Sequence, residues 1–278
     1  MLRKLTNYFV PGENFHYLGS GRKSATFRSE SGKILRIKLK PIWFGTYKKE
    51  AKILRFINQN GGLTCKIPDI HAFTIMPFAI SVHTDFGGMT GDKNVDFDKL
   101  APETQKTFAC QLTESLIRLQ KVGEKPDAKK VVKRKKHLFF RRIKYFFFLW
   151  NKKELRTKWL KLQRAYLKKN PKLVLTHNDL HFGNIIVDND FNLIGLIDFE
   201  HILFCPFEYN LRKFDKPLRD YIIEYCKSIG YEIDNTVLSY YRAEFFLSRL
   251  MMPSKRDSWD VFYWELNNVL DEFILQQT

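Results

Sequence analysis

The stretch Leu175–Glu200, LTHNDLHFGNIIVDNDFNLIGLIDFE, places polar residues at both ends of two short apolar runs. The runs NIIV and NLIGLI are rich in β-branched residues and are separated by the turn signal DND, which predicts a β-hairpin. His177, Asp179 and Asn184 lie on the loop that enters the first strand, and Asp198 lies where the second strand ends. A hairpin brings its open ends close together, so the two carboxylates and the carboxamide are expected to converge.

A cluster of hard oxygen ligands of this kind suits Mg²⁺, which takes one or two carboxylates and completes its shell with water and phosphate oxygens. The spacing H-x-D-x-x-x-x-N, with D-F following 14 residues later, is the kinase arrangement of a base, a metal-binding Asn and a metal-binding Asp. The competing interpretation is a polar hairpin loop whose side chains have no chemical role.

On the motifs HNDLHFGN and IDFE, the chain resembles the aminoglycoside phosphotransferase and choline kinase superfamily, whose members carry H-[GN]-D-x-x-x-x-N and I-D-[FW]-[ED] in this order. The resemblance implies that Asp179 accepts the proton of an acceptor hydroxyl. It also implies that Asn184 and Asp198 hold Mg²⁺ against the phosphates of ATP, while His177 orients the loop.

The resemblance also implies a fold class: α+β, a bilobal protein-kinase-like fold with a small antiparallel-sheet N-lobe carrying one helix and a mainly helical C-lobe. The nucleotide-binding N-lobe is expected over residues 1–84 and the catalytic, acceptor-binding C-lobe over residues 85–278. Apolar spacing predicts a core helix over Pro102–Leu119. Asn210 stands where the superfamily often has an Asp, which leaves open whether the role of that acid in acceptor binding or loop support is kept.

Three amphipathic segments near the C-terminus predict helices over residues 218–230, 235–252 and 257–276. Their aromatic side chains are expected in the core, with a minority lining an acceptor pocket. These aromatic residues include Tyr240, Tyr241, Trp259 and Trp264.

The front of the chain offers a candidate phosphate-binding loop. The segment FHYLGSGRKSATFRSESGKILRIKL reads as three strands with a turn at SESG. Gly19 and Gly21 would let the backbone approach phosphates, and Ser24 stands where a third glycine would complete G-x-G-x-x-G. An ordinary turn is the alternative interpretation.

The third of these strands carries two cations on one face, because strand side chains alternate between faces. They are Arg36 and Lys38. The following helical segment places Glu50 on its apolar stripe, where an acid is costly unless it is paired. The resemblance implies a cation–Glu pair near the nucleotide, with Arg36 favoured and Lys38 as runner-up. Solvated charges on an edge strand remain the other interpretation.

Composition describes a folded globular protein: 278 residues with 44% hydrophobic and 15% aromatic content. Its 4 cysteines show neither C-x-x-C nor metal-ligand spacing. The first residues lack the apolar core of a signal peptide, and no uncharged run reaches bilayer length. These features predict a cytoplasmic protein with reduced thiols.

The net charge of +17 is concentrated in one segment. Residues 121–170 contain 19 Lys and Arg against 3 acidic residues, a net of +16. Basic clusters alternate there with LFF and YFFFLW, a composition that suits peripheral contact with an anionic membrane on its inner face. Nucleic-acid binding is a weaker alternative. The third interpretation is a helical insert whose aromatics pack on the C-lobe and whose lysines are merely solvated.

The favoured function is transfer of the γ-phosphate of ATP to a hydroxyl of a small molecule, sugar or glycolipid head group. The basic segment is expected to repel polycationic aminoglycosides, so sugars and anionic or membrane-borne acceptors, such as lipopolysaccharide or lipid-linked saccharides, rank higher. The alternative from another class is a membrane- or nucleic-acid-binding module with a vestigial kinase-like fold. A protein kinase ranks low, because no A-P-E segment follows DFE.

Overall fold

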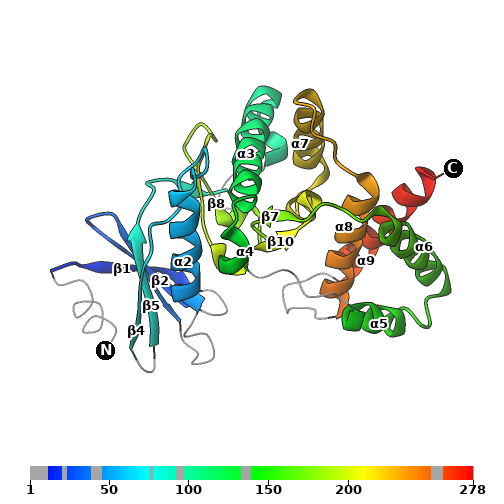
Figure 1. Ribbon diagram of the computed structural model, residues 1–278, viewed down its shortest axis with the longest axis horizontal. Helices are drawn as coiled ribbons and strands as arrows, with labels where there is room; N and C mark the ends of the chain where they lie inside the picture. Colours follow the sequence, from blue (N-terminus) through cyan, green and yellow to red (C-terminus); the bar gives the residue numbers. More distant parts are fainter. Residues whose placement is uncertain are drawn as a thin grey trace. The chain divides into compact units, whose positions relative to one another are not determined.

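The computed structural model contains two compact units, and Figure 1 shows their helices and strands. The first unit is made of residues 1–132 and 181–202, and the second of residues 133–180 and 203–278. The lobe boundary between residues 84 and 85 stays a prediction. The structure describes residues 12–20, 24–38, 46–75, 78–91, 97–132, 139–251 and 259–277.

The first unit begins with an antiparallel sheet in the order β1-β2-β3-β5-β4. One face of this sheet packs a small apolar core that includes Leu35, Ile37 and Ile80. Successive pairing of β1, β2 and β3 follows from the short turns between them, as the sequence predicted. The strands are β1 (Phe15–Ser20), β2 (Ser24–Ser29), β3 (Lys33–Lys38), β4 (His71–Ile75) and β5 (Phe78–Thr84).

One helix, α2 (Thr46–Gln59), packs against β4 and β5. Its predicted apolar stripe is buried, since Glu50, Leu54 and Ile57 are at most 1% exposed. The helix ends where the amide of Gly62 donates to the carbonyl of Ile57 at 3.0 Å, and Gly62 has φ +60°. A residue without a side chain accepts this left-handed backbone at no steric cost.

The remainder of the first unit supports the predicted hairpin. Strands β8 (Ile185–Val187) and β9 (Leu193–Leu196) pair antiparallel, and β6 (Met89–Thr90) extends the sheet in the order β6-β8-β9. The Asp188 carboxylate closes the turn by accepting the backbone amides of Asp190 and Asn192. Helix α3 (Pro102–Gly123) confirms the predicted core helix. Shorter helices of this unit are η2 (Phe97–Lys99), α4 (Ala128–Val131), η3 (Phe182–Asn184) and η4 (Phe199–His201).

The second unit is mainly helical and holds a two-stranded sheet. Strand β7 (Val174–Thr176) leads into the HNDLHFGN motif and pairs with β10 (Leu203–Cys205). Two helices from the basic segment, α5 (Phe139–Phe148) and α6 (Lys153–Lys169), precede β7. The elements after β10 are η5 (Phe207–Leu211), α7 (Lys216–Ser228), α8 (Asn235–Met251) and α9 (Trp259–Leu275).

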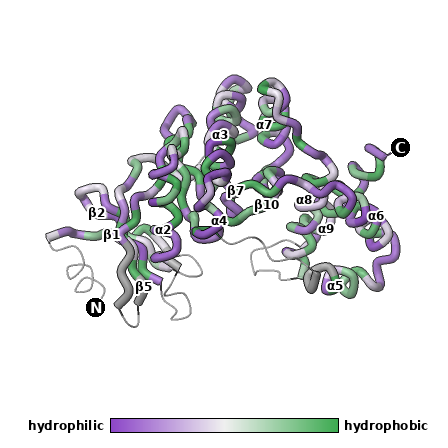
Figure 2. Tube along the Cα trace, viewed as in Figure 1, coloured by the Kyte–Doolittle hydropathy of each residue, from purple (hydrophilic) through white to green (hydrophobic). Residues whose placement is uncertain are grey.

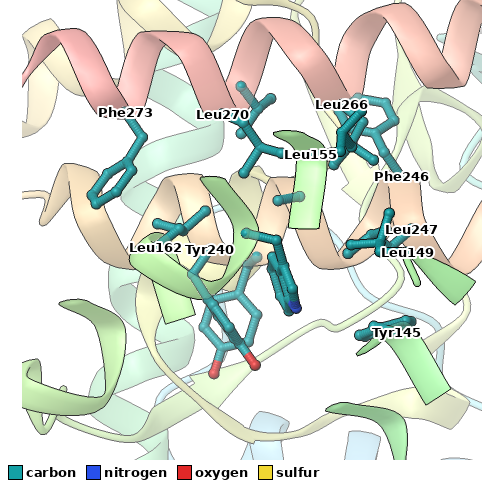
Figure 3. Close-up of a cluster of buried hydrophobic side chains, with 14 of the residues drawn as sticks. Tyr145, Leu149, Leu155, Leu162, Tyr240, Phe246, Leu247, Leu266, Leu270 and Phe273 are labelled. Carbon is teal, nitrogen blue, oxygen red and sulfur yellow. The ribbon is translucent and has the colours of Figure 1, made fainter. Parts of the chain in front are cut away.

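The core of the second unit lies between α6, α8 and α9 (Figure 3). Trp159 from the basic segment is fully buried and stacks on Tyr240 at 5.3 Å between ring centroids. Part of the aromatic content of the segment is therefore core, as the third interpretation of that segment expected. Tyr240 and Tyr241 are buried as predicted, but Trp259 and Trp264 are 39% and 62% exposed. The core face of α9 is made instead by Leu266, Val269, Leu270 and Phe273.

An antiparallel sheet with one helix near the N-terminus, followed by a mainly helical C-terminal part, confirms the predicted α+β fold class.

Candidate active site

The cation of β3 that pairs with Glu50 is Arg36. Its guanidinium lies 3.5 Å from the carboxylate of Glu50, which is fully buried on α2. Burial opposes the charge of Arg36, but the neighbouring carboxylates outweigh that effect and its pKa is raised. Burial also raises the pKa of Glu50, against the attraction of Arg36. The pKa values of both residues are raised, that of Arg36 because it has further acidic neighbours and that of Glu50 because it is fully buried.

Lys38 has a different partner, Glu200, which lies two residues after Asp198. The side chains of Lys38 and Glu200 are 1% and 4% exposed, so this ion pair is almost completely buried. Burial would raise the pKa of Glu200, but hydrogen bonds from His201 and Lys38 lower it. The alternation of β3 placed Arg36 and Lys38 on one face, and one acid, Glu50, was assigned to them from the sequence. A second cation that is buried on this face requires another acid. That requirement was the available signal for Glu200, to which no role was assigned from the sequence.

Arg36 also joins β3 to the end of the hairpin. Its second terminal nitrogen lies 3.3 Å from Asp198, and Glu50 accepts the backbone amide of Phe199 at 3.0 Å. The aromatic ring of Tyr47 lies beneath both strand cations, 5.2 Å from Arg36 and 4.7 Å from Lys38. We call Arg36, Lys38, Glu50, Asp198 and Glu200 the carboxylate-rich centre, because two cations there contact three carboxylates.

The two predicted metal ligands occupy the same end of the hairpin. Ile185 pairs with Leu196, and the next rung is a hydrogen bond from the amide of Ile197 to the carbonyl of Asn184 at 3.0 Å. Asp198 follows at once with φ +65°, a backbone conformation that Asp tolerates better than most residues. One carboxylate and one carboxamide oxygen match the partial protein shell that Mg²⁺ uses. Within the described ranges, no group of three His, Cys, Asp or Glu side chains is placed to hold a metal by itself.

The structure describes only part of the candidate phosphate loop. Gly19 lies in β1 with φ +156°, at a register shift against β2, and its α-carbon faces open space. Ser24 begins β2 and is paired with Lys38 on β3. Gly21 lies outside the described residues. The roles of these residues in nucleotide binding stay predictions.

The HNDLHFGN motif lies in the second unit as far as Leu180. Three consecutive residues of this loop are held by one short segment, residues 210–213. The backbone amide of His177 donates to the side-chain oxygen of Asn210 at 3.0 Å. Arg212 donates to the carbonyl of Asn178, which has φ +68°. Lys213 forms an ion pair with Asp179. We call residues 177–179 and 210–213 the cation-rich loop.

This arrangement shows how Asn210 supports the loop, and a role of Asn210 in acceptor binding stays untested. A neutral carboxamide oxygen accepts the loop amide as a carboxylate would, so the supporting hydrogen bond is present without the negative charge. The sequence did not indicate Arg212 or Lys213, because their partners are 34 residues away and no local periodicity connects them. His181 is placed by its own contact: its Nδ1 accepts the amide of Gly183 at 3.1 Å and caps η3.

Comparisons with known proteins agree with this fold. A family model described as the phosphotransferase enzyme family matches residues 15–211. The GDP complex of wild-type aminoglycoside 2'-phosphotransferase IIIa has a TM-score of 0.74 at 14% identity, with 98% of each chain covered. The macrolide 2'-phosphotransferase of Brachybacterium faecium gives 0.67 at 12% identity, with 96% of each chain covered. A spectinomycin phosphotransferase with ADP and spectinomycin gives 0.62 at 17% identity, covering 93% of this chain and 91% of that one. A sequence search against curated proteins finds no match.

The structural likenesses show the fold, and the family model covers well over half of the chain. The family model confirms the predicted resemblance and the predicted enzyme class, a phosphotransferase. The chain belongs to the phosphotransferase enzyme family.

Proposed function

We propose that this phosphotransferase transfers the γ-phosphate of ATP to a hydroxyl of a sugar, a glycolipid head group or another small molecule. The observation that carries the proposal is the hairpin end, where Asn184 and Asp198 lie together and Arg36 reaches Asp198. All the oxygen ligands expected for a metal-bound nucleotide are present, which counts against a vestigial fold.

In this proposal Asn184 and Asp198 hold Mg²⁺, and Arg36, oriented by Glu50, faces the phosphates. The metal ion, when bound, neutralises charge on the β- and γ-phosphate oxygens. The residues proposed to take part in nucleotide binding also include Gly19, Gly21, Ser24 and Lys38. Lys38 acts there indirectly, because its charge is committed to Glu200.

Asp179 is the proposed base. Its carboxylate accepts the proton of the acceptor hydroxyl as the hydroxyl oxygen bonds to the γ-phosphorus, and the bond from that phosphorus to the bridging oxygen of ADP breaks. Asn210 and Arg212 hold the backbone of its loop, so the loop backbone requires little reorganisation before transfer.

We also propose that the enzyme works at an anionic membrane surface, which favours a membrane-borne acceptor. Phe147 and Trp150 at the α5–α6 turn are 66% and 55% exposed. Their rings stack, and the guanidinium of Arg156 lies 5.2 Å from the Trp150 ring. Lys152 lies 5.0 Å from the half-exposed ring of Trp259.

Exposed aromatic rings beside cations are the composition of a bilayer interface. Residues 139–169 contain 11 Lys and Arg against 1 Glu, and Figure 2 shows hydrophilic residues along much of α6. No described helix is long and apolar enough to cross a bilayer. The contact that we propose is a peripheral one. We call Phe146, Phe147, Trp150, Lys152, Arg156 and Trp259 the aromatic turn patch.

The test of the proposed activity is acceptor-stimulated consumption of Mg·ATP by purified wild type and Asp179→Asn. The acceptors are aminoglycosides, choline, simple sugars, and lipid-linked or lipopolysaccharide saccharides. Turnover is expected with at least one saccharide and is expected to be nearly lost in Asp179→Asn, which keeps nucleotide binding. Asp190→Asn, the same change on the exposed hairpin turn, is expected to match wild type. Full activity in Asp179→Asn would remove Asp179 as the base, and no turnover with any acceptor would remove the proposed function.

A further inference from the structure

The side chain proposed as the base already has a cationic partner. Lys213 is paired with the Asp179 carboxylate, and the two side chains are 14% and 30% exposed. Lys213 follows Arg212, which holds the neighbouring carbonyl of Asn178. A base that takes a proton from an incoming hydroxyl must present a carboxylate oxygen to it. The acceptor therefore meets a carboxylate whose Oδ1 is already paired with the Lys213 ammonium group.

Two arginines add positive charge around Lys213. Arg212 and Arg249 both lie within electrostatic range of its ammonium group, and Asp179 is the carboxylate that opposes them. Arg212 itself is stacked on the Tyr209 ring at 3.6 Å, so its position is fixed. Burial lowers the pKa of Lys213, and the two arginines lower it further against the attraction of Asp179.

An anionic group on the acceptor would address both the pairing of Asp179 with Lys213 and the positive charge around Lys213. It can bind Lys213 in place of Asp179, which leaves the carboxylate to receive the hydroxyl proton, and it reduces the local excess of positive charge. A neutral sugar offers no group of this kind. A polycationic aminoglycoside is expected to be repelled by the positive charges of Lys213, Arg212 and Arg249.

We propose that the acceptor is an anionic hydroxyl compound, a sugar acid or a sugar phosphate, and that Lys213 binds its anionic group beside Asp179. This inference rests on the proposed function of the same site. Lys213 is a substrate-binding residue in this scheme, and Arg212 is a positioning residue that acts through the loop backbone.

The test is a charge series of acceptors on one carbon skeleton: galacturonate, galactose and galactosamine, with the gluco and manno series and their 6-phosphates beside them. Wild type is expected to prefer the anionic members in kcat/KM by roughly tenfold to a hundredfold, the value of one charge-assisted hydrogen bond. Lys213→Met is expected to give similar kcat/KM for the anionic, neutral and cationic acceptors. Lys213→Glu is expected to reverse the order of preference, and Lys213→Arg is expected to keep the wild-type order. Equal kcat/KM across the charge series in wild type overturns the proposal.

The matched control is Lys216→Glu, the same charge change three residues along the chain. Lys216 is 68% exposed and paired with Asp220 rather than with Asp179. It is expected to leave the order of acceptors unchanged. Reversal of the order in Lys216→Glu as well would show that net charge, rather than Lys213, sets the preference, and this result overturns the proposal.

A binding measurement separates this inference from the proposed activity. Asp179→Asn removes the carboxylate that competes for Lys213, so calorimetric titration with the anionic sugars of the panel is expected to show tighter binding than in wild type. The added change Lys213→Glu is expected to abolish that binding. If wild type turns over no acceptor but this pattern holds, the proposed activity fails while the anion site stands. No binding of any anionic sugar to Asp179→Asn overturns the anion site.

Discussion

The carboxylate-rich centre of the first unit and the cation-rich loop of the second unit use the same kinds of side chain in opposite proportions. In the first, Arg36 and Lys38 contact three carboxylates. In the second, Asp179 is opposed by Lys213, with Arg212 and Arg249 in range. A centre with excess negative charge is suited to a cation, and one with excess positive charge to an anion.

The two regions also differ in what their ion pairs do. Lys38 and Glu200 are almost completely buried, so the pair holds β3 against η4 and is not free to exchange partners. Lys213 and Asp179 keep some access to water, so a ligand can replace either partner. Burial therefore separates a charge pair that stabilises the fold from one that is available for binding.

The largest expected effect tests the first half of this comparison. Asp198→Ala removes a proposed metal ligand and one carboxylate partner of Arg36. We expect transfer to fall by roughly a thousandfold or more and Mg²⁺ to lose its effect on nucleotide affinity, measured by calorimetry with and without Mg²⁺. Asp188→Ala, at the other end of the same hairpin, is the control and is expected to keep Mg²⁺ dependence. Unchanged Mg²⁺ dependence in Asp198→Ala would contradict the metal assignment.

The next prediction compares the two lysines directly. Lys38→Met removes the lysine charge from the buried Glu200, which keeps its contact with His201. We expect the free energy of unfolding to fall by about 3–5 kcal/mol. Lys213→Met leaves a carboxylate that water can reach, and we expect a loss of about 1 kcal/mol or less. Denaturant titration of both variants measures the difference. Similar losses in the two variants would remove the distinction between a structural pair and an exchangeable pair.

The third prediction uses His83 on β5 to sharpen the description of the first unit. Burial and the nearby charge of Arg36 lower the pKa of His83 from 6.5 to about 4. Between these values the unfolded chain binds the proton and the folded chain does not, so stability is expected to decrease as pH falls from about 6.5 to about 4. The expected decrease is about 3 kcal/mol. His83→Gln should remove this part of the pH dependence in denaturant titrations, and an unchanged slope would contradict a neutral, buried His83.

The sequence predicted the elements whose signals are local. The hairpin follows from two apolar runs and a turn, and the helix with Glu50 follows from an apolar stripe. The fold class needed the motif resemblance as well, since periodicity alone does not give the strand order. Trp264 was wrongly expected in the core, although the spacing of Leu266, Val269, Leu270 and Phe273 already excludes it from their face.

The candidate site was predictable where one motif carried it. Asp179, Asn184 and Asp198 come from a fixed spacing in a single stretch. Lys213 was not predictable, because its contact with Asp179 depends on how η5 follows β10, and that is a property of the tertiary fold. Charge counting leads to an expectation of the same kind: a basic chain favours an anionic partner, and this stays a prediction.

The smallest expected effect asks whether positive charge in the second unit also serves the aromatic turn patch. Trp150→Ser removes an exposed ring that Arg156 contacts, while Trp264→Ser removes a comparably exposed ring of α9 that lies outside the patch. We expect Trp150→Ser to weaken binding to vesicles of mixed phosphatidylglycerol and phosphatidylcholine by roughly tenfold, and Trp264→Ser to change it little. Co-sedimentation measures both, with pure phosphatidylcholine vesicles as the uncharged reference. Equal losses in the two variants would show that exposed tryptophan in general drives the binding, and no binding by wild type would confine the role of the positive charge to the loop around Asp179.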